Sequence, residues 1–157
     1  EQRQQLARDL LSEAGYSAAN PLRFTYSFDS QDESRKVAIA LAAMWKAAGI
    51  EVELVDKEFR GLSGDRMSGI VEALRFAFFS PLDDPYFFLE LLESDNPGNS
   101  SRYSNPAFDE MLRQSNFIAD RAERMEFLAQ AELMAMADHA IMALFFYVWR
   151  RRVPSYV

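Results

Sequence analysis

The sequence predicts an α/β fold, a mixed sheet with helices packed on it. Segments of helical and strand periodicity follow one another in the order α-β-α-β-α-β-α-α-α-β, the alternation expected when helices cover a sheet. The chain has 157 residues, of which 49% are hydrophobic, so it is long and apolar enough to bury a core. No internal repeat or linker interrupts it, and we expect residues 1–157 to form a single domain.

The first predicted elements are a helix over residues 2–14 and a strand over residues 22–28. Gly15 suits the left-handed conformation that often follows the end of a helix. In the strand every second residue is apolar, a period that places one face on a core and the other near solvent. The helix is expected to place on one face Leu6, Leu10 and Leu11.

A capping-box pattern predicts the start of the next helix. Ser30 and Glu33 are three residues apart, so the serine can accept from first-turn amides while the glutamate reaches back. The helix is expected over residues 32–48, and Gly49 is placed to end it. Its apolar stripe consists of Val37, Leu41, Met44 and Ala48.

The middle of the chain predicts a strand over residues 51–55, a helix over residues 59–68 that ends at Gly69, and a strand over residues 71–78. An aromatic loop interrupted by two prolines follows. One regular element cannot bury all of its rings, so we expect part of this surface to face a ligand or another part of the protein. The rings belong to Phe78, Phe79, Tyr86, Phe87 and Phe88.

The last third predicts three helices and a strand. Residues 93–104 have turn composition, and Asn105 and Asp120 stand at positions that cap the helices after them. The continuous apolar run 141–149 is typical of a central strand covered on both faces. The helices are expected over residues 86–92, 106–118 and 121–137.

Composition excludes several functions. The net charge of −7 argues against nucleic-acid binding, because affinity for a polyanion comes from clustered cations. The absence of cysteine excludes thiolate nucleophiles and cysteine metal sites. No Gly-rich phosphate loop or zinc-binding motif occurs, and we expect no catalytic residue, metal or cofactor.

Carboxylates and one histidine leave a hydrolase as an alternative function. It would use Asp83, Asp84 and His139. However, the side chains of adjacent residues on an extended chain point apart, so the two aspartates do not suit a catalytic pair. The structural interpretation is that one of them caps the helix that begins at Pro85, and that His139 lies in a turn.

Two arginines are candidate ligand contacts. Arg75 lies on the strand predicted over residues 71–78, between the small side chains of Ala73 and Ala77. Its planar fork of donors would suit a carboxylate or phosphate, although an internal ion pair explains the position equally well. Arg66 lies on the preceding helix.

The order of segments resembles the C-terminal lobe of the oligopeptide- and dipeptide-binding proteins, extracytoplasmic solute-binding proteins (family 5) of ABC importers. The resemblance covers essentially the whole chain. It is carried by Ala14-Gly15-Tyr16, Leu22 to Tyr26, Ala43-Met44-Trp45-Lys46, Gly49 to Leu54, Asp83-Asp84-Pro85, Phe88-Leu89, Arg102 to Asp109, Ala131-Glu132 and Ala143 to Tyr147.

This resemblance implies one lobe of a two-lobed clamp of the type II periplasmic-binding-protein class, which closes over a solute and presents it to a permease. Arg66 and Arg75 would receive a peptide carboxylate. Phe78 stands where the family has a tryptophan, and Pro81 where it has the aspartate that pairs with the peptide amine. Proline cannot pair with an amine, so either Asp83 takes the role of the family's aspartate or the ligand lacks a free amine. The expected ligand contacts are Arg66, Arg75, Phe78, Phe79, Ser80, Pro81 and Asp83.

The family also implies partners and a compartment. We expect a peptide or other small solute, the ABC permease subunits and the N-terminal lobe of the same protein as partners, with no nucleic acid. The parent protein would be periplasmic or extracytoplasmic, with its signal peptide upstream of this fragment. A non-peptide or modified-peptide solute such as an opine, sugar or metal chelate is the alternative ligand, and the exposed cleft surface predicts self-association of the fragment. A self-standing interaction module built on the aromatic loop is a further alternative.

Overall fold

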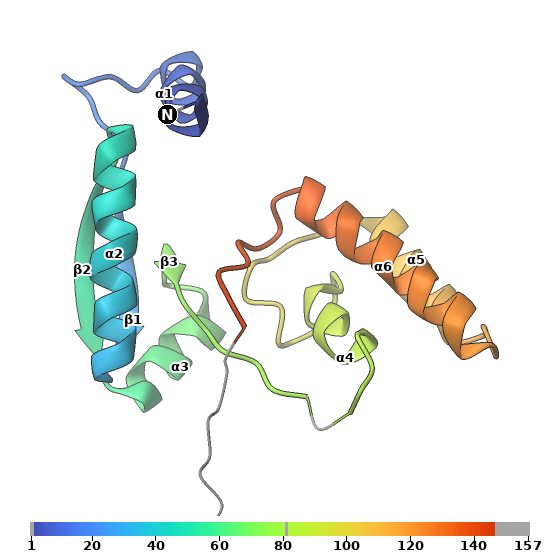
Figure 1. The fold of residues 1–157 in the computed structure, drawn as a ribbon. Coiled ribbons are helices and arrows are strands. Elements are labelled where there is room, and N and C mark those ends of the chain that lie inside the picture. The colour runs from blue at the N-terminus through green and yellow to red at the C-terminus, as the bar shows by residue number, and fades with distance from the viewer. Residues whose placement is uncertain (1, 81, 147–157) are drawn as a thin grey trace, which may run out of the picture. The chain divides into compact units, whose positions relative to one another are not determined.

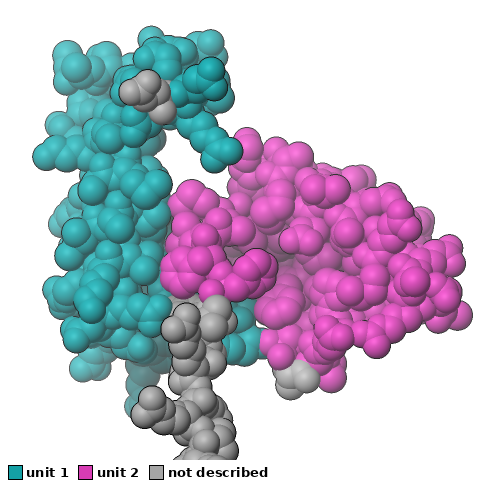
Figure 2. Space-filling model, viewed as in Figure 1, with its two compact units in different colours: residues 1–79 teal, residues 80–157 magenta. Residues whose placement is uncertain are grey.

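The computed structural model describes residues 2–80 and 82–146, and its chain forms two compact units (Figures 1 and 2). The first unit is Glu1–Phe79 and the second is Ser80–Val157. Each has a hydrophobic core of its own. The α/β class is confirmed, and the expectation of a single domain over residues 1–157 stays a prediction.

The first unit is an open sheet with helices. β1 lies at the centre of the strand order β2-β1-β3, and both pairings are parallel. In the register, Tyr26 on β1 stands opposite Leu54 on β2 and Ala73 on β3. The elements are α1 Gln2–Glu13, β1 Arg23–Asp29, α2 Asp32–Ala48, β2 Glu51–Lys57, α3 Phe59–Ser68 and β3 Ala73–Leu74.

Both faces of the central strand are covered. The chain passes from β1 through α2 to β2, then returns through α3 to β3 on the other side of β1. Because parallel crossovers are right-handed, two crossovers in opposite directions place α2 and α3 on opposite faces. Tyr26 and Phe28 pack in one core cluster with α2 residues, while Ser27, which points the other way, is also buried.

Local stop signals in this unit are confirmed, and one start signal is wrong. α3 spans the predicted residues 59–68, and Gly49 and Gly69 end their helices in the left-handed conformation. The capping box at Ser30 does not form, because the Ser30 hydroxyl donates to the Asp56 carboxylate and to the backbone carbonyl of Lys57. Gln31 is the N-cap residue of α2, without a side-chain cap.

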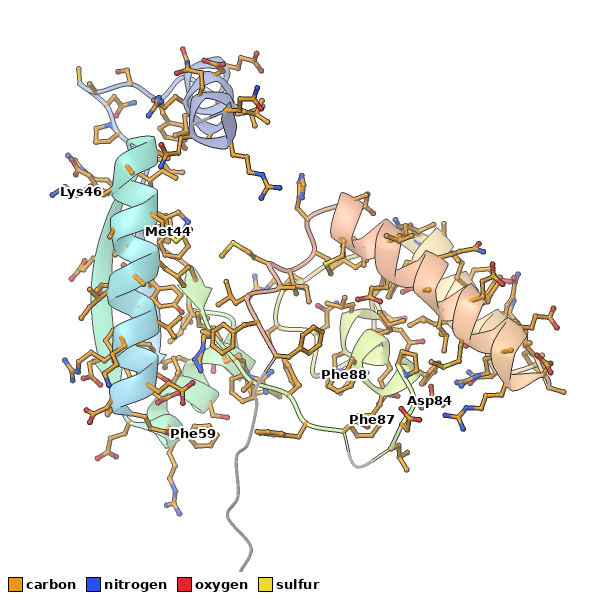
Figure 3. All side chains as sticks on the ribbon, in the orientation of Figure 1. Met44, Lys46, Phe59, Asp84, Phe87 and Phe88 are labelled. Carbon is orange, nitrogen blue, oxygen red and sulfur yellow. The ribbon has the colours of Figure 1, made fainter. Side chains whose placement is uncertain are left out.

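One packing prediction for α2 is also wrong, at Met44. Met44 (labelled in Figure 3) is 67% exposed, whereas Leu41 and Ala48 of the predicted stripe are buried, together with Ser34 and Ala38. No residue of α1 is buried. The third strand is shorter than expected, because only Ala73 and Leu74 pair with β1 and the chain leaves the sheet at Arg75.

The second unit is helical. Its core is built from Leu89, Leu92, Phe108, Leu112, Leu128, Ala131 and Ala135. Asn105 and Asp120 cap their helices as predicted, each accepting hydrogen bonds from first-turn backbone amides. The elements are α4 Tyr86–Leu89, the 3₁₀ helix η1 Glu90–Leu92, α5 Pro106–Ser115 and α6 Arg121–Ala137.

The closing strand predicted over residues 141–149 is wrong where the structure describes it. Residues 141–146 form no regular element, and the Phe146 side chain is 97% exposed. An apolar run becomes a strand only beside a partner strand, and none pairs with this segment among the described residues. Residues 147–149 lie outside the described part of the chain. No helix within residues 2–80 and 82–146 has the length and hydropathy to span a membrane.

Candidate ligand-binding site

The carboxyl ends of the three parallel strands meet at one edge of the first unit. Open α/β sheets bind ligands outside the carboxyl ends of their strands, where the strand order reverses direction. Here it reverses at β1, between β2 and β3. The residues that follow the strands at this edge are Ser30 and Gln31 after β1, Glu58 and Phe59 after β2, and Arg75 and Phe76 after β3. We call this region the carboxyl-end edge.

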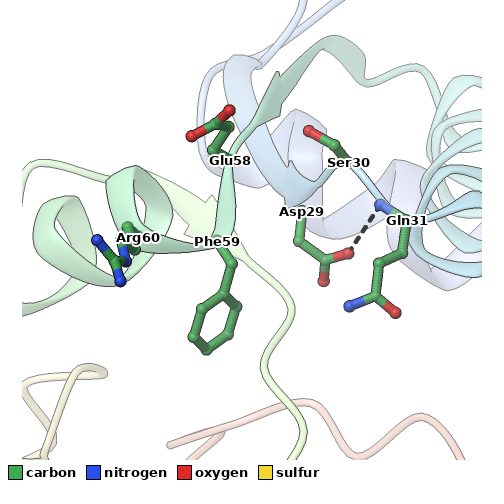
Figure 4. A pocket seen from close by; sticks show the side chains of 6 residues that line it. All are labelled: Asp29, Ser30, Gln31, Glu58, Phe59 and Arg60. Carbon is green, nitrogen blue, oxygen red and sulfur yellow. Dashed lines mark hydrogen bonds between the residues drawn. The ribbon is translucent and has the colours of Figure 1, made fainter.

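An open hollow of about 400 Å³ lies at the carboxyl-end edge (Figure 4). The Asp29 carboxylate is held in place there, because it accepts hydrogen bonds from the Gln31 backbone N–H at 3.0 Å and from the Ser34 hydroxyl at 2.8 Å. The Phe59 side chain is 58% exposed. The hollow is lined by Asp29, Ser30, Gln31, Glu58, Phe59 and Arg60.

A row of three phenylalanines continues from the hollow. The ring centroid of Phe76 lies 6.2 Å from that of Phe59 and 5.1 Å from that of Phe78. The Arg66 guanidinium lies over the Phe76 ring, 4.4 Å from its centroid, a cation–π contact. We call Phe59, Phe76 and Phe78 the aromatic row. It offers an apolar surface with one cation fixed above its centre.

Arg75 brings a positive charge to the same edge. Its side chain is half-buried, directly after β3. Its charge acts on the buried Tyr26 hydroxyl. Burial raises the pKa of Tyr26, the Arg75 charge lowers it in part, and the Asp29 charge raises it further. Arg66 and Arg75 therefore both belong to the first unit, as do the exposed rings of Phe78 and Phe79.

The remaining candidate ligand contacts lie in the second unit or outside the residues that the structure describes. The Ser80 hydroxyl bonds locally, donating to the Leu82 carbonyl and accepting from the Leu82 N–H. Asp83 forms an ion pair with Arg121 at 2.7 Å, and both side chains are largely exposed. Such a pair contributes about 0–1 kcal/mol, so a ligand amine could compete for Asp83. Pro81 lies outside the described residues.

Asp84, one of the residues of the alternative hydrolase, has a structural role. Asp84 accepts from the Tyr86 backbone N–H at 3.0 Å, so one of the two aspartates does hold the start of α4, as the structural interpretation expects. Its carboxylate is also paired with Arg124. His139 is exposed, in a turn after α6, with φ of 56°.

The second unit has a smaller hollow of about 270 Å³ with acidic walls, formed by Glu93, Ser94, Asp95, Asn96 and Asp109. Burial raises the pKa of Glu93, and the charges of Asp109 and Glu90 raise it further. The Asp109 carboxylate accepts from the Ser94 backbone N–H at 3.0 Å, which fixes the loop to α5. Across residues 2–80 and 82–146, no group of three or more His, Cys, Asp or Glu is arranged to hold a metal ion.

Sequence reasoning missed Asp29, Gln31 and Phe59 as candidates. Each lies at or just after the carboxyl end of a parallel strand, where α/β sheets place ligand contacts. Their position at the ends of strands in a predicted β-α-β order is the feature of the sequence that indicates them as candidates. The register that brings the ends of β1 and β2 together depends on pairing between distant segments.

Comparison with known proteins gives a consistent set of relatives. The sequence profile described as bacterial extracellular solute-binding proteins, family 5 Middle, matches residues 2–100. The periplasmic oligopeptide-binding protein OppA of Salmonella typhimurium is 33% identical over 158 residues, which cover 100% of this chain and 29% of that protein. The periplasmic murein peptide-binding protein MppA of Escherichia coli is 37% identical over 111 residues, covering 70% of this chain and 21% of that protein.

A solved structure agrees with these matches. Haemophilus influenzae OppA, in complex with RPPGFSPFR, superposes with a TM-score of 0.85 and 32% identity, over 88% of this chain and 28% of that chain. The chain therefore spans less than a third of the length of these relatives.

Proposed function

The chain belongs to family 5 of the bacterial extracellular solute-binding proteins, and from this premise we propose that the whole protein binds oligopeptides for uptake by an ABC transporter. The chain would supply one ligand-facing edge of a two-lobed clamp. The relatives are named as binding proteins for oligopeptides and murein peptides, which supports a peptide as the solute. The task would be binding and release, without chemical change of the solute.

The observation that carries this proposal is the composition of the carboxyl-end edge. Arg75 follows β3 where the strand order reverses, and the aromatic row lies beside it with Arg66 above Phe76. A peptide needs partners for a terminal carboxylate and apolar surface for its side chains, and this edge offers both. Phe78 and Phe79 are 45% and 66% exposed, so their rings remain accessible to a ligand.

The proposal extends to partners and compartment. A lobe elsewhere in the same protein would close over the carboxyl-end edge, and permease subunits of the ABC transporter would receive the loaded protein. The protein would act in the periplasm or another extracytoplasmic space, as the names of its relatives indicate for them. Ser80 and Asp83 in the second unit, and Pro81, are proposed as further ligand contacts. Self-association of the chain through exposed aromatic surface stays a prediction.

Isothermal titration calorimetry on the full-length protein that contains this chain tests the proposal. Tri- and tetrapeptides are titrated beside opines, sugars and metal chelates, and we expect heat from peptides alone. In the Arg75→Gln variant, affinity for a peptide with a free terminal carboxylate should fall about tenfold or more, because a charge-assisted bond contributes about 1.5–3 kcal/mol. Heat from another solute class and from no peptide would overturn the proposal.

Two controls separate ligand contact from structural damage. Arg3→Gln makes the same charge change on the exposed surface of α1 and should leave affinity unchanged. A C-terminally amidated peptide lacks the carboxylate, so its affinity should hardly differ between wild type and Arg75→Gln. An equal loss for the free and amidated peptides would show that Arg75 acts through the fold of the edge instead.

A further inference from the structure

The hollow beside Phe59 has a chemistry of its own. In the view of Figure 4, the Asp29 carboxylate, the Gln31 side chain and the Phe59 ring extend to the same side, while Glu58 and Arg60 project away from them. These groups comprise a fixed carboxylate, an amide oxygen and an exposed aromatic face. They are the partners that an ammonium or guanidinium group uses.

The charges around the hollow favour a cation. The basic residues nearest to it in sequence besides Arg60 are Arg35 and Lys57, and they are already paired with Asp56 and Asp65. Asp29 makes no ion pair with any residue that the structure describes. The remaining acids near the hollow are Glu58 on its wall and Asp32 and Glu33 in the first turn of α2.

An anionic ligand is disfavoured at the same place. The start of a helix usually attracts anions, because its first backbone amides lack partners. At α2, however, Asp29 already accepts from the Gln31 backbone N–H and from the Ser34 hydroxyl. A ligand carboxylate would therefore approach the Asp29 carboxylate, which already accepts the Gln31 N–H and the Ser34 hydroxyl.

We propose that this hollow is a specificity subsite for a basic side chain of the bound peptide, with Asp29 and Gln31 as hydrogen-bond acceptors and Phe59 as the stacking surface. This rests on the proposed peptide-binding function. The preferred ligands would then be peptides that carry lysine or arginine. Peptides with a neutral or acidic residue in place of the basic one, or with an acetylated lysine, should bind more weakly.

Calorimetry on the full-length protein tests this with matched peptides. Lys-Ala-Ala, Ala-Lys-Ala and Ala-Ala-Lys are each compared with the same peptide carrying Nε-acetyl-lysine, which keeps the length and removes the charge. We expect at least one lysine peptide to bind about 5- to 20-fold more tightly than its acetylated form, with the ratio shrinking at high salt. This comparison needs no variant, so it does not depend on a mutant folding.

Two variants then locate the preference. Asp29→Asn keeps an oxygen acceptor for the Gln31 N–H and should bring the ratio close to one. Asp32→Asn removes the same charge from an exposed residue of α2 that does not line the hollow, and should leave the ratio within about twofold. Phe59→Leu should reduce the ratio while leaving affinity for the acetylated peptides nearly unchanged.

The outcomes separate this inference from the proposed function. Equal affinity for lysine and acetyl-lysine peptides at all three positions overturns the subsite and leaves peptide binding intact. A preference for lysine that survives Asp29→Asn places the cation site elsewhere and also overturns the subsite. If no peptide binds and another class of solute does, the proposed function fails and the subsite with it.

Discussion

The Arg124 guanidinium on α6 holds the Asp84 carboxylate, with Nη1 and Oδ2 2.6 Å apart. The same guanidinium donates from Nε to the Ser115 carbonyl at 3.0 Å and lies 5.6 Å from the centroid of the Tyr86 ring. Partial burial acts to raise the pKa of Asp84. The bond from Arg124, the Tyr86 backbone N–H and the charges of Arg124 and Arg121 outweigh it and lower the pKa. One arginine thus ties the start of α4 to α5 and α6.

Arg124→Met should destabilise the second unit by about 1.5–3 kcal/mol, because it leaves a partly buried carboxylate and a carbonyl without their donor. Native-state hydrogen exchange of the buried amides of Leu128 and Ala131 measures the loss within this unit. Arg113→Met is the matched control. It breaks the exposed ion pair with Glu110, which solvent screens, so we expect a much smaller loss of stability than for Arg124→Met. Equal effects of the two substitutions would refute the clamping role of Arg124.

Ionisation of the Tyr103 hydroxyl should lower the free energy of unfolding at alkaline pH. Its hydroxyl donates to the Asp138 carboxylate at 2.6 Å, and burial together with this bond raises the pKa of Tyr103 to about 12. A group whose folded pKa lies above its unfolded value of about 10 stabilises the fold fully below pH 10 and loses that contribution as pH rises through 12.

Amide hydrogen exchange is too fast to follow at alkaline pH. The free energy of unfolding is therefore measured between pH 8 and 12 by urea unfolding, followed by circular dichroism. Tyr103→Phe should be less stable than wild type by about 1–2 kcal/mol at pH 8, with the difference shrinking toward pH 12. A constant difference across this range would show that the hydroxyl does not titrate as the Asp138 contact requires.

Two glycines should respond to alanine with opposite signs. Gly49 follows α2 with φ of 95°, in a conformation that costs an L-residue about 1–2 kcal/mol, so Gly49→Ala should destabilise the protein. Gly61 lies inside α3, where an added Cβ meets no atom within 4 Å, so Gly61→Ala should stabilise by about 0.5–1 kcal/mol. Urea unfolding of both variants checks this, and the same sign for both would contradict the backbone argument.

Features set by neighbouring residues could be predicted from the sequence. The bounds of α3, the caps at Asn105 and Asp120, and the helix ends at Gly49 and Gly69 depend on residues within one turn. Features set by distant partners could not. The predicted capping serine, Ser30, bonds instead to Asp56 and Lys57 on β2, which only the folded sheet brings near.

The same distinction explains the candidate site. Arg66, Arg75 and Phe78 were proposed from their places in the sequence together with the family resemblance, and in the structure Arg66 and Phe78 both lie against the Phe76 ring. Phe59 and Asp29 were missed, because their proximity follows from the parallel pairing of β1 and β2. The strand predicted over residues 71–78 stopped at Leu74 for a related reason, since strand length depends on pairing with β1.

We propose above that the carboxyl-end edge of the first unit faces a bound peptide. A crystal structure of the full-length protein with a bound tripeptide tests it most directly. We expect ligand atoms in contact with Phe78 and a ligand carboxylate within hydrogen-bond distance of the Arg75 guanidinium. A peptide bound elsewhere in the protein, with no contact to Phe59, Arg66, Arg75 or Phe78, would contradict it.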